Sequence, residues 1–196
     1  MAENHRGDHL VLVGIRGSGK TTLGRLLARR MGCLFLDTDD LVAAAQGMSV
    51  SAIFERFGES RFRAAERQAL AQIEDLDQPA VVATGGGIIL DESNRIALRR
   101  AGLVVWLDLP TDVAAARIAG SDRPSLTGRP PAEELADIAA MRRTLYEEVA
   151  DRRIQAAEHL EDLVADLEGL WDRWRRERKT NPRDRERSVS DPGRRN

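Results

Sequence analysis

The sequence predicts a three-layer α/β/α domain, in which helices cover both faces of a parallel sheet. The first observation is an alternation along the chain. Short apolar runs, of which residues 103–107 form the clearest, are followed by longer stretches with apolar residues at helical spacing. The second is a glycine-rich segment, residues 14–21, between the first apolar run and the first helical stretch. The third is that Asp residues follow the second apolar run and three glycines follow the third. In a parallel sheet such positions lie at the carboxyl ends of the strands, which is the edge where ligands bind.

The glycine-rich segment reads G-I-R-G-S-G-K-T and matches G-x-x-x-x-G-K-[ST], the phosphate-binding P-loop. Residues 10–13 before it read as a buried strand, and residues 22–31 after it have a helical apolar stripe that ends at Gly32. This order aims backbone N–H groups and a helix N-terminus at a bound anion, so the fold is expected to be of the P-loop NTP hydrolase and kinase type. Lys20 would reach the β- and γ-phosphates of a nucleotide, and the Thr21 hydroxyl would bind Mg²⁺. The residues expected to contact the nucleotide here are Gly14, Gly17, Ser18, Gly19, Lys20, Thr21 and Thr22.

The remaining elements follow from the same two signals, apolar runs for strands and apolar stripes at helical spacing for helices. Strands are expected at residues 33–36, 80–83 and 103–107, with a weaker one near 153–156. Helices are expected from about residue 41 with interruptions at Gly47 and at 58–60, and then over 61–76, 91–101, 110–118, about 133–149 and 160–174. The domain is therefore expected to cover residues 9–172, between a disordered lead of residues 1–8 and a charged, disordered tail of residues 173–196.

Composition limits the class of protein. The 30 Lys and Arg against 32 Asp and Glu give a formal net charge of −2, so we expect neither nucleic acid nor a membrane as a partner. The basic charge is concentrated in residues 171–196, which carry ten Lys or Arg and five Asp or Glu but no interleaved aromatic residues after Trp174. Cys33 is the only cysteine, and the polar N-terminus has no apolar signal region, so we expect a cytoplasmic protein. We also expect it to be a monomer.

Two carboxylates follow the second predicted strand. Asp37 and Asp39 are two residues apart, and side chains at that spacing in a strand share a face, so both could project into the phosphate cleft. One could hold a water bound to Mg²⁺ while the other accepts a proton from an attacking hydroxyl. The alternative is capping, in which Asp39 or Asp40 is the N-cap of the next helix.

Two further segments suggest a substrate pocket. Arg63 and Glu66 are three residues apart on a predicted helix, where a salt bridge would fix the guanidinium for a substrate carboxylate, although a solvated helix face gives the same pattern. Gly85, Gly86 and Gly87 follow the third predicted strand, and a backbone without Cβ atoms lets a ligand approach closely. A flexible turn is the alternative for these glycines.

Residues 119–132 are rich in Gly, Ser, Pro and Arg and lack periodicity, so they are expected to form a mobile lid. Arg123 in this lid could close over a transferring phosphoryl group, neutralise its charge and help to exclude water. Arg117 and Arg129 are nearby alternatives for that role. Arg142 lies on a predicted helix four residues before Tyr146, and by itself it would be interpreted as a surface residue.

With these residues in view, the chain resembles the shikimate kinases, a branch of the nucleoside-monophosphate-kinase-like P-loop proteins, over about residues 8–170. The discriminating motifs are Asp37-x-Asp39, the G-E-x-x-F-R-x-x-E pattern of residues 58–66, the T-G-G-G of residues 84–87, the D-R-P-x-L of residues 122–126, and residues 142–146, which are similar to the family's R-x-P-x-Y with threonine in place of proline.

The resemblance implies transfer of a phosphoryl group from ATP to the 3-hydroxyl of shikimate, in the pathway to chorismate and the aromatic amino acids. It implies Lys20 and Arg123 on the phosphoryl group, and Thr21 and Asp37 at Mg²⁺, with Asp37 acting through water. Asp39 would orient the hydroxyl and act as the base. The shikimate carboxylate would be held by Arg63 and Arg142, in a pocket lined by Gly85, Gly86 and Gly87.

Three alternatives remain from the sequence. One is another small-molecule kinase of this branch, such as a gluconate kinase. A second is a non-kinase NTPase, in which Asp108 at the end of the strand over residues 103–107 would be the metal ligand and water the acceptor. A third is a nucleotide-binding regulator without catalytic activity, although the presence of Lys20, Asp37, Asp39, Arg63 and Arg123 argues against it.

Overall fold

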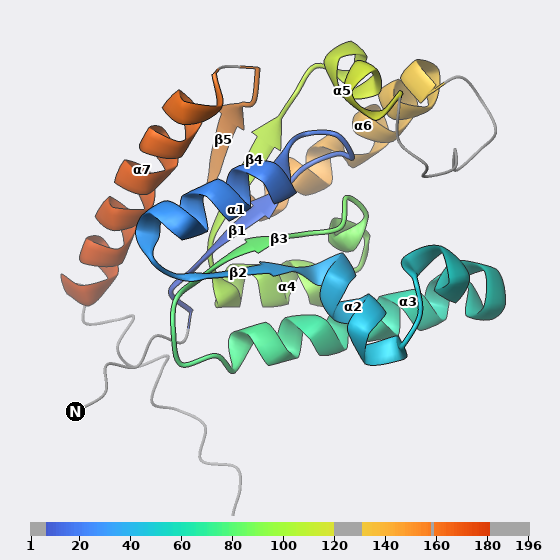
Figure 1. Ribbon diagram of the computed structural model, residues 1–196, viewed down its shortest axis with the longest axis horizontal. Coiled ribbons are helices and arrows are strands. Elements are labelled where there is room, and N and C mark those ends of the chain that lie inside the picture. The colour runs from blue at the N-terminus through green and yellow to red at the C-terminus, as the bar shows by residue number, and fades with distance from the viewer. Residues whose placement is uncertain (1–6, 120–130, 158, 181–196) are drawn as a thin grey trace, which may run out of the picture.

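The computed structural model of the 196-residue chain describes residues 7–119, 131–157 and 159–180. Strands and helices alternate along most of the chain (Figure 1). In order, the elements are β1 (His9–Val13), α1 (Lys20–Met31), β2 (Leu34–Asp37), α2 (Thr38–Gln46), α3 (Val50–Glu74), β3 (Ala80–Ala83), the short 3₁₀ helix η1 (Ile88–Leu90), α4 (Glu92–Ala101), β4 (Gly102–Asp108), α5 (Thr111–Ile118), α6 (Pro131–Val149), β5 (Arg152–Gln155) and α7 (Leu160–Thr180).

The five strands form one parallel sheet in the order β2-β3-β1-β4-β5. Every residue of β1 and β3 is buried, because helices cover both faces of the sheet at its centre. The two edge strands are more exposed: β2 is partly accessible and β5 begins with Arg152 and Arg153 at the surface. The apolar side chains of the central strands therefore form the middle layer of the core.

Helices α1 and α7 pack against each other on one face of the sheet, and α4 and α6 cover the other face, with α3 beside α4 (Figure 1). The α/β/α architecture predicted from the sequence is confirmed. All five predicted strands are present, each within one residue of its expected bounds or matching them. In the described residues, no helix combines the length and the apolar character needed to cross a bilayer.

Two local expectations differ from the structure. Helix α2 begins at Thr38, earlier than expected, because the Asp37 side chain accepts a hydrogen bond from the Asp39 amide and acts as the N-cap. Asp37 is thus the cap, whereas the sequence had suggested Asp39 or Asp40. The interruption expected over residues 58–60 is a single kink at Gly58 (φ 74°, ψ 179°) within the long helix α3.

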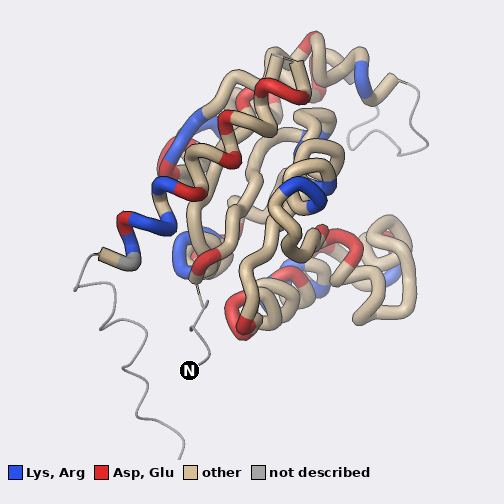
Figure 2. Tube along the Cα trace, turned by 60° about the vertical axis from the view of Figure 1, so that its left-hand side comes forward, with Lys and Arg blue, Asp and Glu red and all other residues tan. Residues whose placement is uncertain are grey.

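The expected boundary between domain and tail was residue 172, but α7 continues eight residues further, to Thr180. The last turns of α7 contact the start of the chain. Trp171 Nε1 donates to the Asp8 carbonyl at 3.1 Å, Arg178 donates to the Gly7 carbonyl, and the Arg178 guanidinium stacks over the Trp174 ring at 4.9 Å. Asp8 is likewise buried, although the lead was expected to be disordered up to that residue. Lys and Arg residues are concentrated in these last turns of α7 (Figure 2).

Candidate active site

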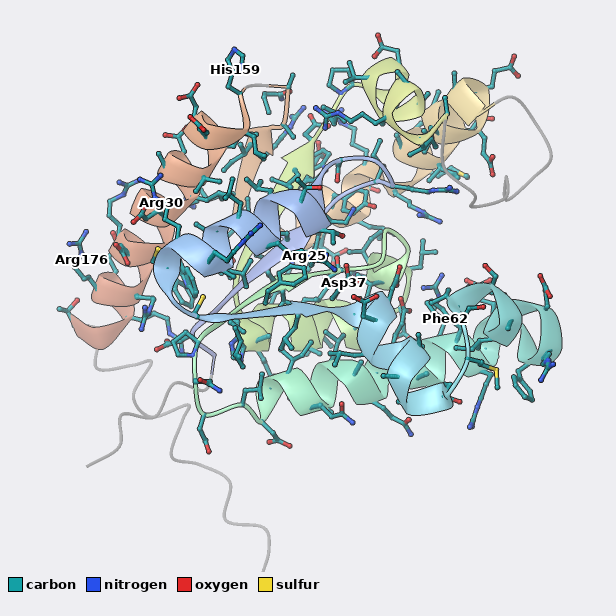
Figure 3. The ribbon with its side chains drawn as sticks, viewed as in Figure 1. Arg25, Arg30, Asp37, Phe62, His159 and Arg176 are labelled. Atoms are coloured by element: carbon teal, nitrogen blue, oxygen red, sulfur yellow. The ribbon has the colours of Figure 1, made fainter. Side chains whose placement is uncertain are left out.

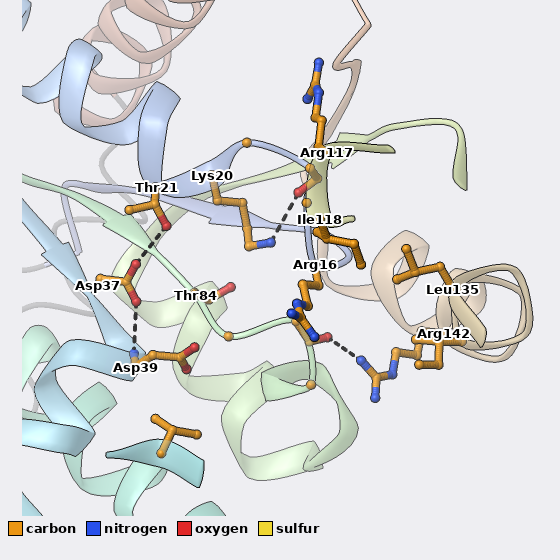
Figure 4. A pocket seen from close by; sticks show the side chains of 18 of the residues that line it. Arg16, Lys20, Thr21, Asp37, Asp39, Thr84, Arg117, Ile118, Leu135 and Arg142 are labelled. Carbon is orange, nitrogen blue, oxygen red and sulfur yellow. Dashed lines mark hydrogen bonds between the residues drawn. The ribbon is translucent and has the colours of Figure 1, made fainter. Parts of the chain in front are cut away.

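A cleft of about 790 Å³ opens at the carboxyl ends of β1, β2 and β3. The chain leaves β1 through the P-loop to α1 on one face and leaves β3 through residues 84–87 to α4 on the other, which places the cleft where connections diverge. Asp37 at the end of β2 and Phe62 on α3 lie at this end of the sheet (Figure 3). The cleft brings together most of the residues that the sequence singled out, and Figure 4 shows several of them.

The P-loop is folded around the Lys20 side chain. Lys20 Nζ donates to the carbonyls of Gly14 and Ile15 at 2.9 and 2.8 Å and to Ser18 Oγ at 3.2 Å. Gly19 caps α1 in the left-handed conformation at φ 93°, which other residues adopt only at a cost. The N-terminus of α1 therefore faces the cleft, a geometry suited to a phosphate.

Two side-chain oxygen groups lie close together beside the P-loop. Thr21 Oγ1 donates to Asp37 Oδ2 at 2.9 Å, which holds a hydroxyl and a carboxylate together at the cleft. Among the described residues no three His, Cys, Asp or Glu side chains form a cluster that could hold a metal alone. The pair fits Mg²⁺, because this ion commonly takes one or two protein oxygens and completes its shell with water and substrate phosphates.

Asp39 and Gly85 are in close contact on the floor of the cleft. A Cβ on Gly85 would lie 2.6 Å from Asp39 Oδ1, so glycine is required for the carboxylate to occupy this position. The Gly85 amide donates to Thr38 Oγ1 at 3.0 Å, which fixes the loop to the start of α2. Asp37 and Asp39 both reach the cleft, but they do so from an N-cap and a helical turn rather than from one face of a strand.

The Arg63 guanidinium is held by two carboxylates. Arg63 Nη1 donates to Glu66 Oε2 at 2.7 Å, and Nη2 and Nε donate to Glu59 Oε1 at 2.9 and 3.2 Å. Burial raises the pKa of Glu66 to about 7, outweighing the opposing effect of Arg63, and the nearby charges of Asp39 and Asp91 raise it further. Burial acts to lower the pKa of Arg63, but its hydrogen bonds to Glu66 and Glu59 prevail and raise it, so Arg63 stays charged. The predicted helical pair is confirmed, and it faces the cleft rather than solvent.

The second guanidinium comes from α6. Arg142 Nη1 donates to the Gly86 carbonyl at 3.1 Å, and Tyr146 Oη donates to the same oxygen at 2.7 Å. Figure 4 shows the Arg142 side chain reaching from α6 to this loop. A Cβ on Gly87 would lie 2.8 Å from Arg63 Nη2. The two guanidinium groups therefore flank adjacent residues of one glycine loop, and Arg142 is not the surface residue that its helix alone suggested.

The remaining predicted residues are placed as follows. Gly17, Ser18, Gly19, Thr21 and Thr22 line the cleft. Gly14 does not line the cleft, and its carbonyl accepts a hydrogen bond from Lys20 Nζ within the loop. Arg123, its alternative Arg129 and most of the predicted lid fall outside the described residues. Arg117, the other alternative to Arg123, lines the cleft, and its Nη1 lies 3.6 Å from where a Cβ on Gly19 would be.

Several cleft residues were not predicted as site residues. They include Arg16 of the P-loop and, on α3, Glu66 and the apolar residues Val50, Phe54 and Phe62. Helix α6 adds Glu134, Leu135 and Ile138. Phe54 and Phe62 lie within predicted helices, but an apolar stripe at helical spacing does not say whether it faces the core or a ligand. Phe54 lies 4.5 Å from Phe62, ring to ring, and is still 39% exposed, so it gives the cleft an apolar wall.

Asp108 does not have the geometry expected of a metal ligand in the NTPase alternative. Its Oδ2 accepts hydrogen bonds from Arg153 Nε at 2.9 Å and from Gln155 Nε2 at 3.3 Å. It is also absent from the residues that line the cleft and borders a separate cavity instead. Asp108 therefore joins β4 to β5.

Comparisons with known proteins agree with this geometry. A family model described as shikimate kinase matches residues 16–168. The shikimate kinase of Symbiobacterium thermophilum is 44% identical over 163 residues, which cover 81% of this chain and 93% of that protein. Shikimate kinase 2 of Sodalis glossinidius is 42% identical over 162 residues, covering 81% and 92%.

Solved structures give the same result. The structure of the shikimate kinase from Acinetobacter baumannii in complex with shikimate superposes with a TM-score of 0.78 and 36% identity, covering 83% of this chain and 91% of that one. A gluconokinase from Sinorhizobium meliloti shares the fold alone, at 18% identity and a TM-score of 0.53. The family model, the relatives and the cleft agree, and this chain belongs to the shikimate kinase family.

Proposed function

We propose that this protein transfers the γ-phosphoryl group of MgATP to the 3-hydroxyl of shikimate, giving shikimate 3-phosphate and ADP. The observation that carries the proposal is that a P-loop, an acidic side chain and two guanidinium groups all face one cleft. A phosphoryl donor, a hydroxyl acceptor and a carboxylate on the acceptor can be bound there at the same time. Membership of the shikimate kinase family, and the shikimate complex of the Acinetobacter baumannii relative, support this acceptor.

In the proposed complex, the phosphates lie against the P-loop amides and Lys20. Thr21 and Asp37 would hold Mg²⁺, with Asp37 acting through water, and the ion would neutralise charge on the phosphates. Lys20 Nζ donates to the carbonyls of Gly14 and Ile15, and it would move from these partners to the phosphate oxygens. Arg123, which the resemblance assigns to the phosphoryl group, is proposed to neutralise the charge that develops on the transferring group.

The acceptor would bind on the floor of the cleft. Arg63 and Arg142 offer two planar guanidinium groups to the carboxylate, a geometry that favours paired hydrogen bonds. The 3-hydroxyl, two ring positions from the carbon that bears the carboxylate, would then lie at Asp39. Asp39 accepts the hydroxyl proton, the hydroxyl oxygen bonds to the γ-phosphorus, and the bond from that phosphorus to the β,γ-bridging oxygen breaks to release ADP.

The test is ADP release measured with shikimate, with gluconate and without an acceptor. We expect release to depend on shikimate and to match the formation of shikimate 3-phosphate by mass. Equal release without an acceptor would identify an NTPase instead, and faster release with gluconate would identify a different small-molecule kinase. Binding of ATP without release under any of these conditions would favour the regulator.

A further inference from the structure

We propose that Tyr146 is a positioning residue for the substrate, which sets the orientation of Arg142 through the carbonyl oxygen that the two side chains share. The inference rests on the proposed function, because Arg142 is taken to bind the substrate carboxylate. The inference assigns to Tyr146 a role in the affinity for the acceptor, in addition to its packing in the hydrophobic core.

The Gly86 carbonyl receives two side-chain donors. Tyr146 Oη lies 2.7 Å from it and Arg142 Nη1 lies 3.1 Å from it. The carbonyls of Gly85 and Gly87 are used differently, since they accept from the amides of Ile88 and Leu90 in the 3₁₀ turn. Among the hydrogen bonds of the described residues, it is thus the middle carbonyl of the three glycines that joins the loop to α6.

The loop has little room to move away from these donors. A Cβ on Gly86 would lie 3.3 Å from the Gly14 carbonyl and 3.4 Å from the Arg16 amide, so the peptide is packed between the P-loop and α6. Arg142 and Tyr146 are four residues apart on α6 and therefore face the same way. Since the hydroxyl holds the carbonyl in place, the carbonyl in turn fixes one end of the Arg142 guanidinium and directs its other nitrogens into the cleft.

The Tyr146 ring is rigidly supported from behind. It is 1% exposed and stacks on Trp106 of β4 at 5.6 Å between ring centroids and 14° between planes. The Arg153 guanidinium lies 4.8 Å above the same Trp106 ring and is held by Asp108. This packing fixes the position of the hydroxyl, because a ring held on one face by Trp106 has little freedom about its side-chain bonds.

The protonation state is also suited to a permanent donor. Burial raises the pKa of Tyr146 to about 12, with Arg142 opposing the shift through its charge and hydrogen bonding. The phenol therefore keeps its proton across the neutral range and donates to Gly86 throughout.

The test compares Tyr146→Phe with the wild type in steady-state kinetics. The variant keeps the ring on Trp106 and removes only the hydroxyl. We expect the KM for shikimate to rise about tenfold, while the KM for ATP and kcat change less than about twofold. The assay is run well below the midpoint of thermal unfolding of each variant, so that any loss of folded protein lowers kcat and leaves KM unchanged.

Two further variants separate positioning from stability. Trp171→Phe is the matched control, since it removes a buried side-chain hydrogen bond to the Asp8 carbonyl far from the cleft, and we expect it to lower Tm without changing the KM for shikimate. In an Arg142→Ala background, Tyr146→Phe is expected to have little additional effect on that KM, because the two residues act together.

An unchanged KM for shikimate in Tyr146→Phe would overturn the proposal, as would full additivity of the two substitutions. Equal rises in KM for ATP and for shikimate would also overturn it, because they would indicate a general disturbance of the cleft. Failure of the proposed function itself would be distinct, because the wild type would then show no release of ADP that depends on shikimate.

Discussion

Arg63 Nη1 donates to Glu66 Oε2 at 2.7 Å across one turn of α3, and the Glu66 side chain is only 1% exposed. A buried carboxylate beneath a partly exposed guanidinium holds that guanidinium toward the cleft. Glu59 binds the other side of the same group from the surface. Arg63 is therefore oriented before any ligand arrives, which reduces the entropic cost of binding a carboxylate.

The first prediction concerns the carboxylate clamp. Arg63→Ala is expected to raise the KM for shikimate about 100-fold and that for ATP less than about threefold, because Arg63 lies beside the glycine loop and not at the P-loop. Arg67→Ala is the control, since Arg67 is on the same helix but is 45% exposed and pairs with Asp91. Steady-state kinetics with each substrate varied in turn give the result. Equal losses for the two substrates would contradict the assignment.

The second prediction concerns the proposed base. Asp39→Asn keeps the size of the side chain that packs on Gly85 but removes its ability to accept the proton. We expect kcat to fall at least about 1,000-fold, while the Kd for ATP, measured by calorimetry, changes less than about threefold. Asp40→Asn, one residue further and exposed, should behave as the wild type does. Turnover of Asp39→Asn near the wild-type rate would rule Asp39 out as the base.

The third prediction follows from the pKa of Glu66. Because its folded value of about 7 lies above the ordinary value of 4.5, the folded protein binds more protons than the unfolded chain between these two values. The stability that Glu66 contributes is fully present below pH 4.5 and is lost as the pH rises through about 7. Glutamine has no such titration. The free energy of unfolding of the wild type, relative to Glu66→Gln, should therefore fall by about 2 kcal/mol between about pH 5 and about pH 8.

Urea unfolding at several pH values measures this difference. Glu59→Gln is the matched control, since its side chain binds the same arginine but is 62% exposed. A constant difference between the wild type and Glu66→Gln across this range would show that the carboxylate is not protonated by burial.

The fourth prediction has the opposite sign and concerns His9. Its Nδ1 accepts from the Ala80 amide at 3.2 Å, so its Nε2 donates to the Ile73 carbonyl at 2.9 Å, and the buried ring is neutral. Burial lowers the pKa of His9 below 6.5, against smaller raising effects from Ile73 and Asp8. Below about pH 6.5 the His9 imidazole binds a proton in the unfolded chain but not in the folded protein, so the free energy of unfolding decreases as the pH falls.

His9→Gln removes this titration. Relative to it, the wild type should lose free energy of unfolding on acidification from about pH 7 to about pH 5, with a slope of up to about 1.4 kcal/mol per pH unit. His159→Gln is the control because His159 is exposed near the start of α7 (Figure 3), and it should follow the wild type. Parallel pH profiles for His9→Gln and the wild type would contradict the neutral, buried state.

The fifth prediction concerns the extended end of α7. Deleting residues 173–196 removes Trp174 and Arg178, and with them the contacts to Gly7. We expect this deletion to lower Tm by several degrees, whereas deletion of residues 181–196 should leave Tm nearly unchanged. Differential scanning calorimetry compares the two. An equal Tm for both would show that the contacts with the start of the chain add no stability.

The sequence by itself determined the order of strands and helices, the P-loop and the pairing of Arg63 with Glu66. These features depend on local rules: apolar runs, helical spacing and a backbone conformation that glycine permits. Even there, boundaries shifted where a side chain made a contact that spacing does not record. Asp37 became an N-cap, and the contacts of Trp171 and Arg178 with residues 7–8 accompany the extra turns of α7.

Only the tertiary structure decided which residues meet across the cleft. Arg142 and Tyr146 reach the Gly86 carbonyl from 56 and 60 residues further along the chain, and Asp108 is directed to Arg153 on the neighbouring strand. It also decided that Glu66 is buried enough to raise its pKa to about 7. The physical reason is that burial and contact depend on how the sheet brings distant segments together, whereas periodicity and motif spacing describe only neighbours in the chain.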